Sequence, residues 1–171
     1  MDPIRTFDYL IRARARLLEP LRTLTEAQYR QEFPFGMRRL SATLPHMLNA
    51  EWSYAHRIAT GQRPDRSLAP IPYDTEPPFA DIDAAWPAQS ERTRAAINAS
   101  IDTRQWNTLH ETRTPIDGRT MIVRAPASEI FVQLLCHEVH HRSQAMSMLR
   151  ALGHPVQDLD YSLFNYITWE K

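Results

Sequence analysis

Residues 134–144 read LLCHEVHHRSQ, and this stretch decides both the fold of the chain and its candidate site. Residues four positions apart lie on one face of a helix, so His137 and His141 share a face. Apolar residues continue this face at spacings of three, four or seven, which predicts a long helix that packs into a core. Two imidazoles therefore stand at the centre of an otherwise apolar stripe, formed by Ile130, Leu134, Met148 and Leu152.

Two buried imidazoles need polar partners, because burying them unpaired costs free energy. A divalent metal ion satisfies both His137 and His141, since neutral imidazole is a common ligand and a pair at this spacing can chelate one ion. The alternative is a pair of core histidines that hydrogen-bond to backbone or carboxylate groups. The paired spacing favours the metal. His140 points to one side of both, so we interpret it as a flanking residue or as support for a ligand.

Residues 137–141 also match the H-E-x-x-H pattern of zinc metalloproteases, in which Glu138 would be the general base. The extended form of that pattern fails, because Gln144 and Ser147 stand where glycine and histidine would fall. The preceding chain also lacks the strands of a protease sheet, and we expect Glu138 to face solvent or a neighbouring helix. A di-iron site needs two Glu-x-x-His pairs, and the chain has one. The protease is therefore the weakest of the enzyme interpretations.

Three further stretches carry helical periodicity. The first opens with Asp2 as its N-cap and Pro3 at the first helical position, where the missing N–H costs nothing. The second runs from about residue 41 to 60, and Gly61 ends it, as is typical of a helix C-terminus. The third covers about 81–102, and its inner face is less regular.

The connections complete the expected architecture. Residues 62–79 contain five prolines and no periodicity, which predicts a long crossover loop. Two β-rich runs, 112–116 and 119–123, flank Asp117-Gly118 and predict a small hairpin before the last long helix.

That last helix should open at Pro126 and stop at Gly153, and the aromatic tail, 161–169, should close as a short helix. Residues 25–29 predict a short turn of helix after the first long one. We therefore expect an all-α, single-domain four-helix bundle over residues 1–171, with one small β-hairpin.

Composition excludes several classes of function. Twenty basic residues balance twenty acidic ones, so no long-range attraction favours nucleic acid or an anionic membrane. Cys136 is the single cysteine, which excludes an internal disulfide and a cysteine-based zinc site. The chain begins without the apolar run of a signal peptide, and no apolar stretch approaches the roughly 18 residues of a membrane span. We expect a cytoplasmic protein.

A third metal ligand is not fixed by the helical pattern. The candidates are His46, His56, His110 and His154, and His46 lies off the main apolar stripe of its helix. Glu51 interrupts that stripe. Its carboxylate could orient a histidine or pair with an arginine of a neighbouring helix, and the pattern favours neither.

Three segments carry a resemblance to the DinB/YfiT-like family. Residues 46–52, HMLNAEW, resemble the first ligand motif of that family, and residues 137–144, HEVHHRSQ, resemble the second. Residues 152–155, LGHP, followed by Asp158-Leu159-Asp160, resemble the usual ending. The likeness covers most of the chain. Glu138 inside the second motif and Ser143, where glycine is frequent, depart from the family pattern without touching a ligand.

The resemblance implies a four-helix bundle in up-down-down-up order, often assembled as a homodimer. It implies one divalent ion, nickel or zinc before iron or manganese, held by His46, His137 and His141. It also implies a metal-dependent enzyme that acts on small molecules, most simply a thiol S-transferase or isomerase that uses a low-molecular-weight thiol. A hydrolase, or a metal-binding stress-response protein without catalysis, is the alternative.

Supporting residues stay open at this point. Arg142 could bind a carboxylate of the thiol or substrate, or form an ion pair at the surface. Four aromatic residues could line a pocket, although aromatics at helical spacing more often belong to a core: Trp52, Tyr54, Trp86 and Trp106.

Overall fold

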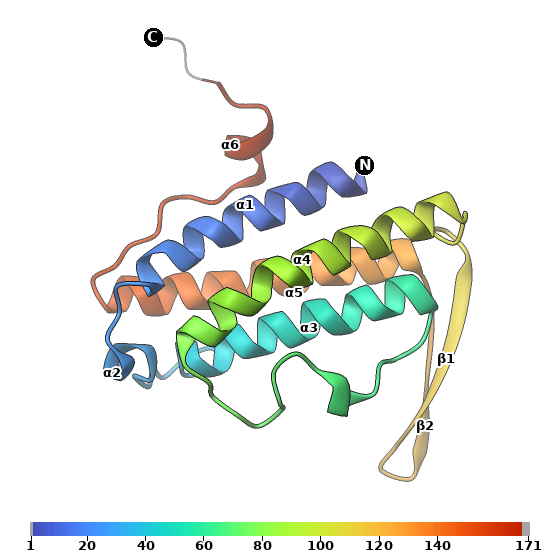
Figure 1. The fold of residues 1–171 in the computed structure, drawn as a ribbon, viewed down its shortest axis with the longest axis horizontal. Coiled ribbons are helices and arrows are strands. Elements are labelled where there is room, and N and C mark those ends of the chain that lie inside the picture. The colour runs from blue at the N-terminus through green and yellow to red at the C-terminus, as the bar shows by residue number, and fades with distance from the viewer. Residues whose placement is uncertain (1, 169–171) are drawn as a thin grey trace.

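The computed structural model describes residues 2–168, and the chain is mostly helical (Figure 1). This confirms the helical class that was expected from the periodicity. The four long helices are α1 (Pro3–Leu21), α3 (Leu40–Thr60), α4 (Phe79–Asp102) and α5 (Ala127–Ala151).

Short elements join and close these helices. α2 (Glu26–Tyr29) follows α1, and a 3₁₀ turn, η1 (Arg66–Leu68), lies within the crossover loop. The hairpin strands, β1 (Leu109–Ile116) and β2 (Arg119–Pro126), are three residues longer at their outer ends than the sequence predicts. α6 (Tyr161–Asn165) is shorter than the expected tail helix, whose last residue, Trp169, lies outside the described residues.

Local chemistry explains where the helices begin and end. The Asp2 carboxylate accepts hydrogen bonds from the backbone N–H groups of Ile4 (2.9 Å) and Arg5 (3.1 Å), which caps α1 as expected. α3 ends at Gly61, which adopts a left-handed conformation with φ +71°. The structure thus confirms both boundary predictions.

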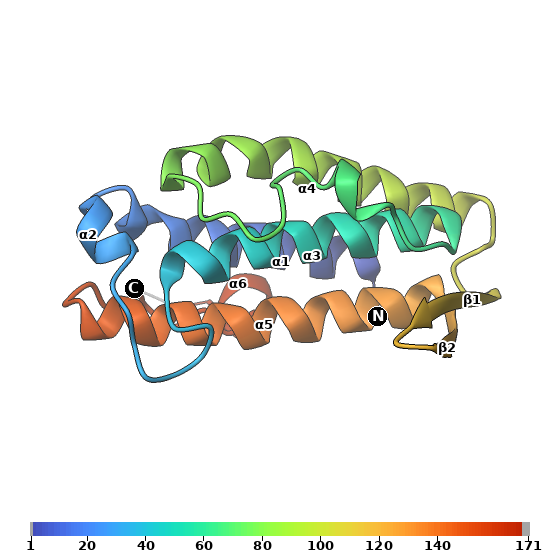
Figure 2. The ribbon, with the colours of Figure 1, turned by 90° about the horizontal axis from the view of Figure 1, so that it is seen from below.

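The long helices lie side by side along the length of the molecule. α3 and α4 run in one direction, and α1 and α5 run in the other (Figure 1). α5 packs along α3, α4 packs along the other side of α3, and α1 lies against α4 and α5 (Figure 2). Because α3 and α4 are parallel, the loop between them, residues 61–78, must return along almost the whole length of α3.

A charged cluster is buried among the apolar side chains of the core. The Arg14 guanidinium of α1 contacts Glu51 Oε2 of α3 at 2.7 Å and Glu138 Oε1 of α5 at 3.2 Å. From α4, the Trp86 indole N–H donates to Glu51 Oε2 at 3.0 Å, and the Thr93 hydroxyl donates to Glu51 Oε1 at 2.8 Å. All four long helices therefore meet at one polar centre.

This cluster decides two questions that the sequence left open. Glu51 pairs with an arginine of a neighbouring helix, and among residues 2–168 no hydrogen bond joins it to a histidine, so the ion-pair interpretation is confirmed. Glu138 faces the neighbouring helix α1 and is only 4% exposed, so the solvent-facing alternative is wrong. Burial raises the pKa of the Glu51 carboxyl above its ordinary value, while Arg14 opposes this rise and Glu138 adds to it.

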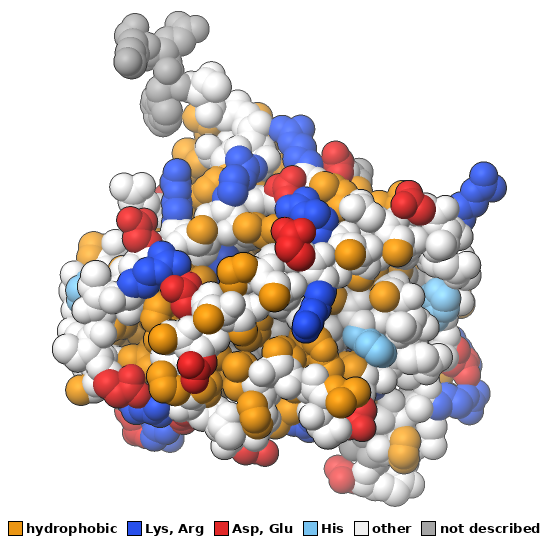
Figure 3. All heavy atoms as spheres, viewed as in Figure 1, with side chains coloured by type: hydrophobic (Ala, Val, Ile, Leu, Met, Phe, Trp, Pro, Cys, Tyr) orange, Lys and Arg blue, Asp and Glu red, His pale blue; other side chains and the backbone are white. Residues whose placement is uncertain are grey.

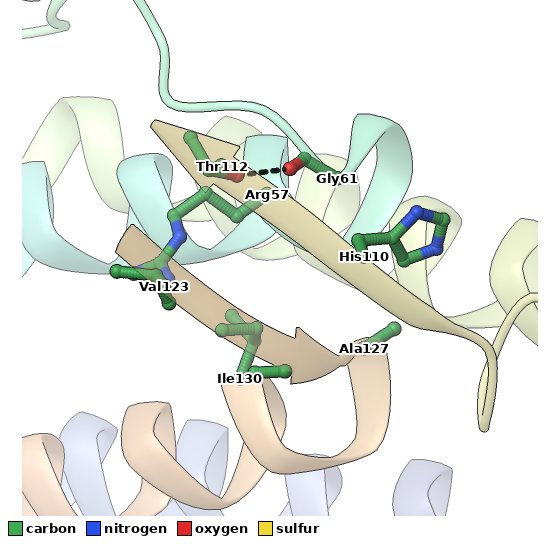
Figure 4. Close-up of a pocket in the computed structure, with 8 residues that line it drawn as sticks. Arg57, Gly61, His110, Thr112, Val123, Ala127 and Ile130 are labelled. Carbon is green, nitrogen blue, oxygen red and sulfur yellow. Dashed lines mark hydrogen bonds between the residues drawn. The ribbon is translucent and has the colours of Figure 1, made fainter. Parts of the chain in front are cut away.

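The hairpin docks on the C-terminal end of α3 (Figure 4). The Thr112 hydroxyl of β1 donates to the Gly61 carbonyl at 2.7 Å. The His110 ring lies so close to Gly61 that a Cβ there would stand 2.9 Å from its Cγ atom. Gly61 thus ends α3 in a left-handed conformation, and β1 packs directly against it.

The face of the molecule seen in Figure 3 is mixed in charge. Figure 3 shows basic and acidic side chains interspersed on the face that carries α1 and α4, with apolar atoms between them. Within residues 2–168, no helix combines the length and apolar character that crossing a bilayer requires.

Replacing Arg14 with leucine should leave two buried carboxylates without their cation. We expect Arg14→Leu to lower the free energy of unfolding by about 3–5 kcal/mol, measured by urea denaturation at pH 7.5. The matched control is Arg22→Leu, which removes the more exposed ion pair to Asp83 and should stay within roughly 1 kcal/mol of wild type. Equal losses in the two variants would contradict the role assigned to Arg14.

Replacing Gly61 with alanine should be more harmful than the same change at Gly153. Both glycines have positive φ, +71° and +83°, but a Cβ would meet the His110 ring at Gly61 and nothing within 4 Å at Gly153. We expect Gly153→Ala to lose about 1–2 kcal/mol from backbone strain, and Gly61→Ala to lose more. The excess should shrink when His110→Ala is added, as measured by thermal unfolding of the single and double variants.

Candidate metal centre

Three histidine side chains converge where α3 packs against α5. His46 of α3 places its Nε2 atom 2.9 Å from Nε2 of His137 and 3.2 Å from Nε2 of His141, both on α5. The candidate ligand atoms of all three lie within 4.8 Å of one another. His137 and His141 come together through their spacing on one helix. His46 joins them only through the contact between two helices.

The hydrogen bonds around His141 fix which of its nitrogens faces the cluster. Its Nδ1 atom lies 2.9 Å from Gln144 Oε1, and an amide oxygen only accepts, so Nδ1 carries the proton. The Nε2 atom of neutral His141 then presents a lone pair toward His46 and His137. The Gln144 amide nitrogen lies 2.9 Å from His140 Nε2. His140 therefore supports the cluster through Gln144 and is not one of its three members.

The arrangement fits one divalent ion. Nitrogen ligands about 2.1 Å from a shared ion lie roughly 3.0–3.4 Å from one another, close to the 2.9 and 3.2 Å that separate His46 Nε2 from the Nε2 atoms of His137 and His141. Nε2 atoms that face one another with lone pairs repel, and a cation between them removes this repulsion. The donor set of three neutral imidazoles also leaves room for a further ligand, as in catalytic rather than closed structural sites.

Burial keeps these imidazoles neutral, which is the form that binds metal. Burial, together with a smaller contribution from the neighbouring histidines, lowers the pKa of His137 to about 4. Burial is also the main cause that lowers the pKa of His46 and of His141 below the ordinary histidine value. The Gln144 hydrogen bond opposes this change at His141.

A short loop and one aromatic ring border the cluster. The Tyr54 ring lies edge-on to the His137 ring, with 5.7 Å between their centroids. Gly36, at φ +59°, lies against Gln144, since a Cβ there would be 3.2 Å from three atoms of that side chain. The loop before α3 therefore packs against Gln144, the residue that orients His141.

The other candidate ligands lie elsewhere. The His110 ring packs against Gly61, where the hairpin meets α3. His56 and His154 lie outside the cluster. Glu138 follows His137 in the chain, but its carboxylate binds Arg14 inside the core. A glutamate held in that way is not free to activate water, which argues against the metalloprotease interpretation.

Arg142 is placed differently from both sequence interpretations. It is 4% exposed, its guanidinium donates to the Tyr9 hydroxyl, and it stacks 5.2 Å from the centre of the Tyr9 ring. It is therefore a core residue between α5 and α1, and its assignment to a surface ion pair is wrong.

The four aromatic residues singled out from the sequence lie in three different places. Trp86 belongs to the core, and Trp106 packs against it. Trp52 lines a groove with His56, and Tyr54 borders the histidines.

Sequence reasoning missed Arg14, although a signal for it exists. Arg14 follows Phe7 and Leu10, and precedes Leu17 and Leu21, at the spacings of the inner face of α1. A charged residue at the centre of a buried face indicates a buried partner of opposite charge. Glu51 interrupts the face of α3 in the same way.

A family model described as the DinB family matches residues 3–171. A search of curated proteins found none that matches this chain.

The pKa of His137 predicts how the metal-free protein responds to acid. Between pH 6.5 and about 4 the unfolded chain binds more protons than the folded one at this position, so stability falls as the pH falls through that window. We expect the free energy of unfolding, measured with a chelator present, to drop further between pH 7.5 and 5 in wild type than in His137→Gln. The difference should be roughly 1 kcal/mol after allowing for solvent screening.

The control for this experiment is His154→Gln, which alters a histidine outside the cluster. Its pH dependence should match wild type. An equal loss of stability in wild type and in His137→Gln would show that the cluster does not resist protonation.

Proposed function

The match spans nearly the whole chain, so the protein belongs to the DinB family, and we propose that it is a metal-dependent enzyme that activates a small thiol for attack on an electrophile. The proposed ligands are His46, His137 and His141, and the proposed ion is nickel or zinc. The observation that carries the proposal is the convergence of three Nε2 atoms from two helices. The thiol chemistry rests on the resemblance described above.

The charge of the donor set supports this chemistry. A divalent ion held by three neutral imidazoles keeps its full charge, so it lowers the pKa of a bound thiol or water and strengthens the nucleophile. The residues of the chain orient the histidines and keep them neutral. Gln144 holds the tautomer of His141, and burial keeps the three imidazoles neutral. Tyr54 borders His137 and shields one side of it.

We also propose that residues 1–171 form one four-helix bundle domain in up-down-down-up order. The opposed directions of α1 and α5 relative to α3 and α4 support this architecture (Figure 1). A homodimer in the cytoplasm stays a prediction from the resemblance and the sequence.

Elemental analysis of the purified protein tests the ligand set. We expect wild type to carry about one nickel or zinc ion per chain, and His46→Ala to lose most of it because a two-histidine site binds far more weakly. The matched control is His56→Ala, which changes another histidine of α3 outside the cluster and should keep the metal. A metal-free wild type that takes up neither ion at pH 7.5 would overturn the proposed centre.

Thiol consumption tests the reaction in the same samples. Metal-loaded wild type should consume a small thiol in the presence of chlorodinitrobenzene faster than the uncatalysed mixture, and His137→Ala should abolish the excess rate. Bound metal that raises the melting temperature without turnover would instead support the non-catalytic metal-binding alternative.

A further inference from the structure

A pocket of about 220 Å³ lies beside the histidine cluster, between α3 and the crossover loop. His46 is the member of the histidine cluster that lines it, so the pocket adjoins the cluster through that ring. Ala42 and Asn49 extend that wall along α3, and Tyr73 and Asp74 of the loop lie opposite. A molecule bound at the histidines could therefore extend into this space.

The loop wall of the pocket is fixed to α3. The Asn49 side chain donates to the Ile71 carbonyl at 2.8 Å and accepts from the Ile71 N–H at 3.2 Å. Both residues are buried. Further along, the Thr75 hydroxyl donates to the Pro72 carbonyl at 2.7 Å. These contacts hold the segment between Pro72 and Thr75 in one place, so the wall is largely formed before a ligand arrives.

Asp74 gives the pocket its charge. It is the one lining residue with a formally charged side chain, and no ion pair or hydrogen bond engages its carboxylate within residues 2–168. Glu76, two residues on, is different. Its carboxylate is held by Arg39 at 2.9 Å and Ser41 at 2.5 Å, so it serves the structure of the loop. Asp74 is exposed at the mouth of the pocket, where its carboxylate can meet a ligand that enters.

We infer that this pocket receives a protonated amine of the substrate and that Asp74 is the residue that recognises it. The inference rests on the proposed function, from which the other end of the substrate is a thiol. The two ends of the substrate must then carry opposite charges. A cation held by neutral histidines attracts an anionic sulfur, whereas a free carboxylate repels an anionic tail and attracts an ammonium group. The substrate class is a small aminothiol.

Three small probes separate the two ends of the substrate. Cysteamine carries a thiol and an ammonium group, 2-mercaptoethanol carries the thiol alone, and ethanolamine carries the ammonium group alone. Their dissociation constants for the zinc-loaded protein would be measured by isothermal titration calorimetry at pH 7.5. Cysteamine should bind more tightly than 2-mercaptoethanol, and we expect Asp74 to contribute up to about five-fold of that preference, as one exposed charge pair predicts.

Two matched variants test the role of Asp74. Asp74→Asn keeps the shape of the side chain and tolerates the positive φ of +64°, so it should fold, and it should reduce the preference for cysteamine relative to wild type. Asp117→Asn makes the same change at another aspartate with positive φ, +48°, in the hairpin turn, and should keep the preference.

Each outcome bears on one end of the proposal. A preference for cysteamine that is as large in Asp74→Asn as in wild type would overturn the amine pocket and leave the thiol function standing. Equal binding of ethanolamine and cysteamine, both weakened by Asp74→Asn, would support the amine pocket and overturn the thiol function. If none of the three probes binds, both are wrong.

Discussion

One guanidinium shared between two buried carboxylates is the interaction on which the rest of this structure depends. Arg14 of α1 can reach Glu51 and Glu138 together only when α3 and α5 hold one rotation and one relative height. Any sliding of either helix would leave a carboxylate buried without its cation, which is costly. Glu138 directly follows His137, so the register that satisfies the ion pairs also sets the height at which His137 meets His46.

Neighbouring residues of α5 serve two different partners. His137 and His141 face α3, where the imidazoles converge, whereas Glu138 faces α1, where its carboxylate binds Arg14. The histidines and the glutamate of the H-E-x-x-H pattern thus lie in two different environments on one helix. In a protease the glutamate must reach the water that the metal holds. Here the packing of α1 on α5 takes the glutamate away from that role, which no pattern within one helix could reveal.

The sequence predicts those features that depend on neighbours along the chain. Helical periodicity, the Asp2 cap and the Gly61 stop placed the long helices closely, and the spacing of His137 and His141 placed both on one face. Features that depend on contacts between distant segments were not predictable in this way. His46 enters the cluster through the approach of α3 to α5, and Arg142 is buried although arginine is usually exposed. In both cases the partner, and not the local pattern, decides the position.

The separation of the histidines along the chain has a consequence for biosynthesis. His46 and His137 are 91 positions apart, with α4 and the hairpin between them. A growing chain on the ribosome therefore has no complete set of three imidazoles until α5, the last long helix, has emerged and docked on α3. An ion held by all three histidines is therefore acquired only once α5 lies against α3, so its occupancy reports on that late contact between helices.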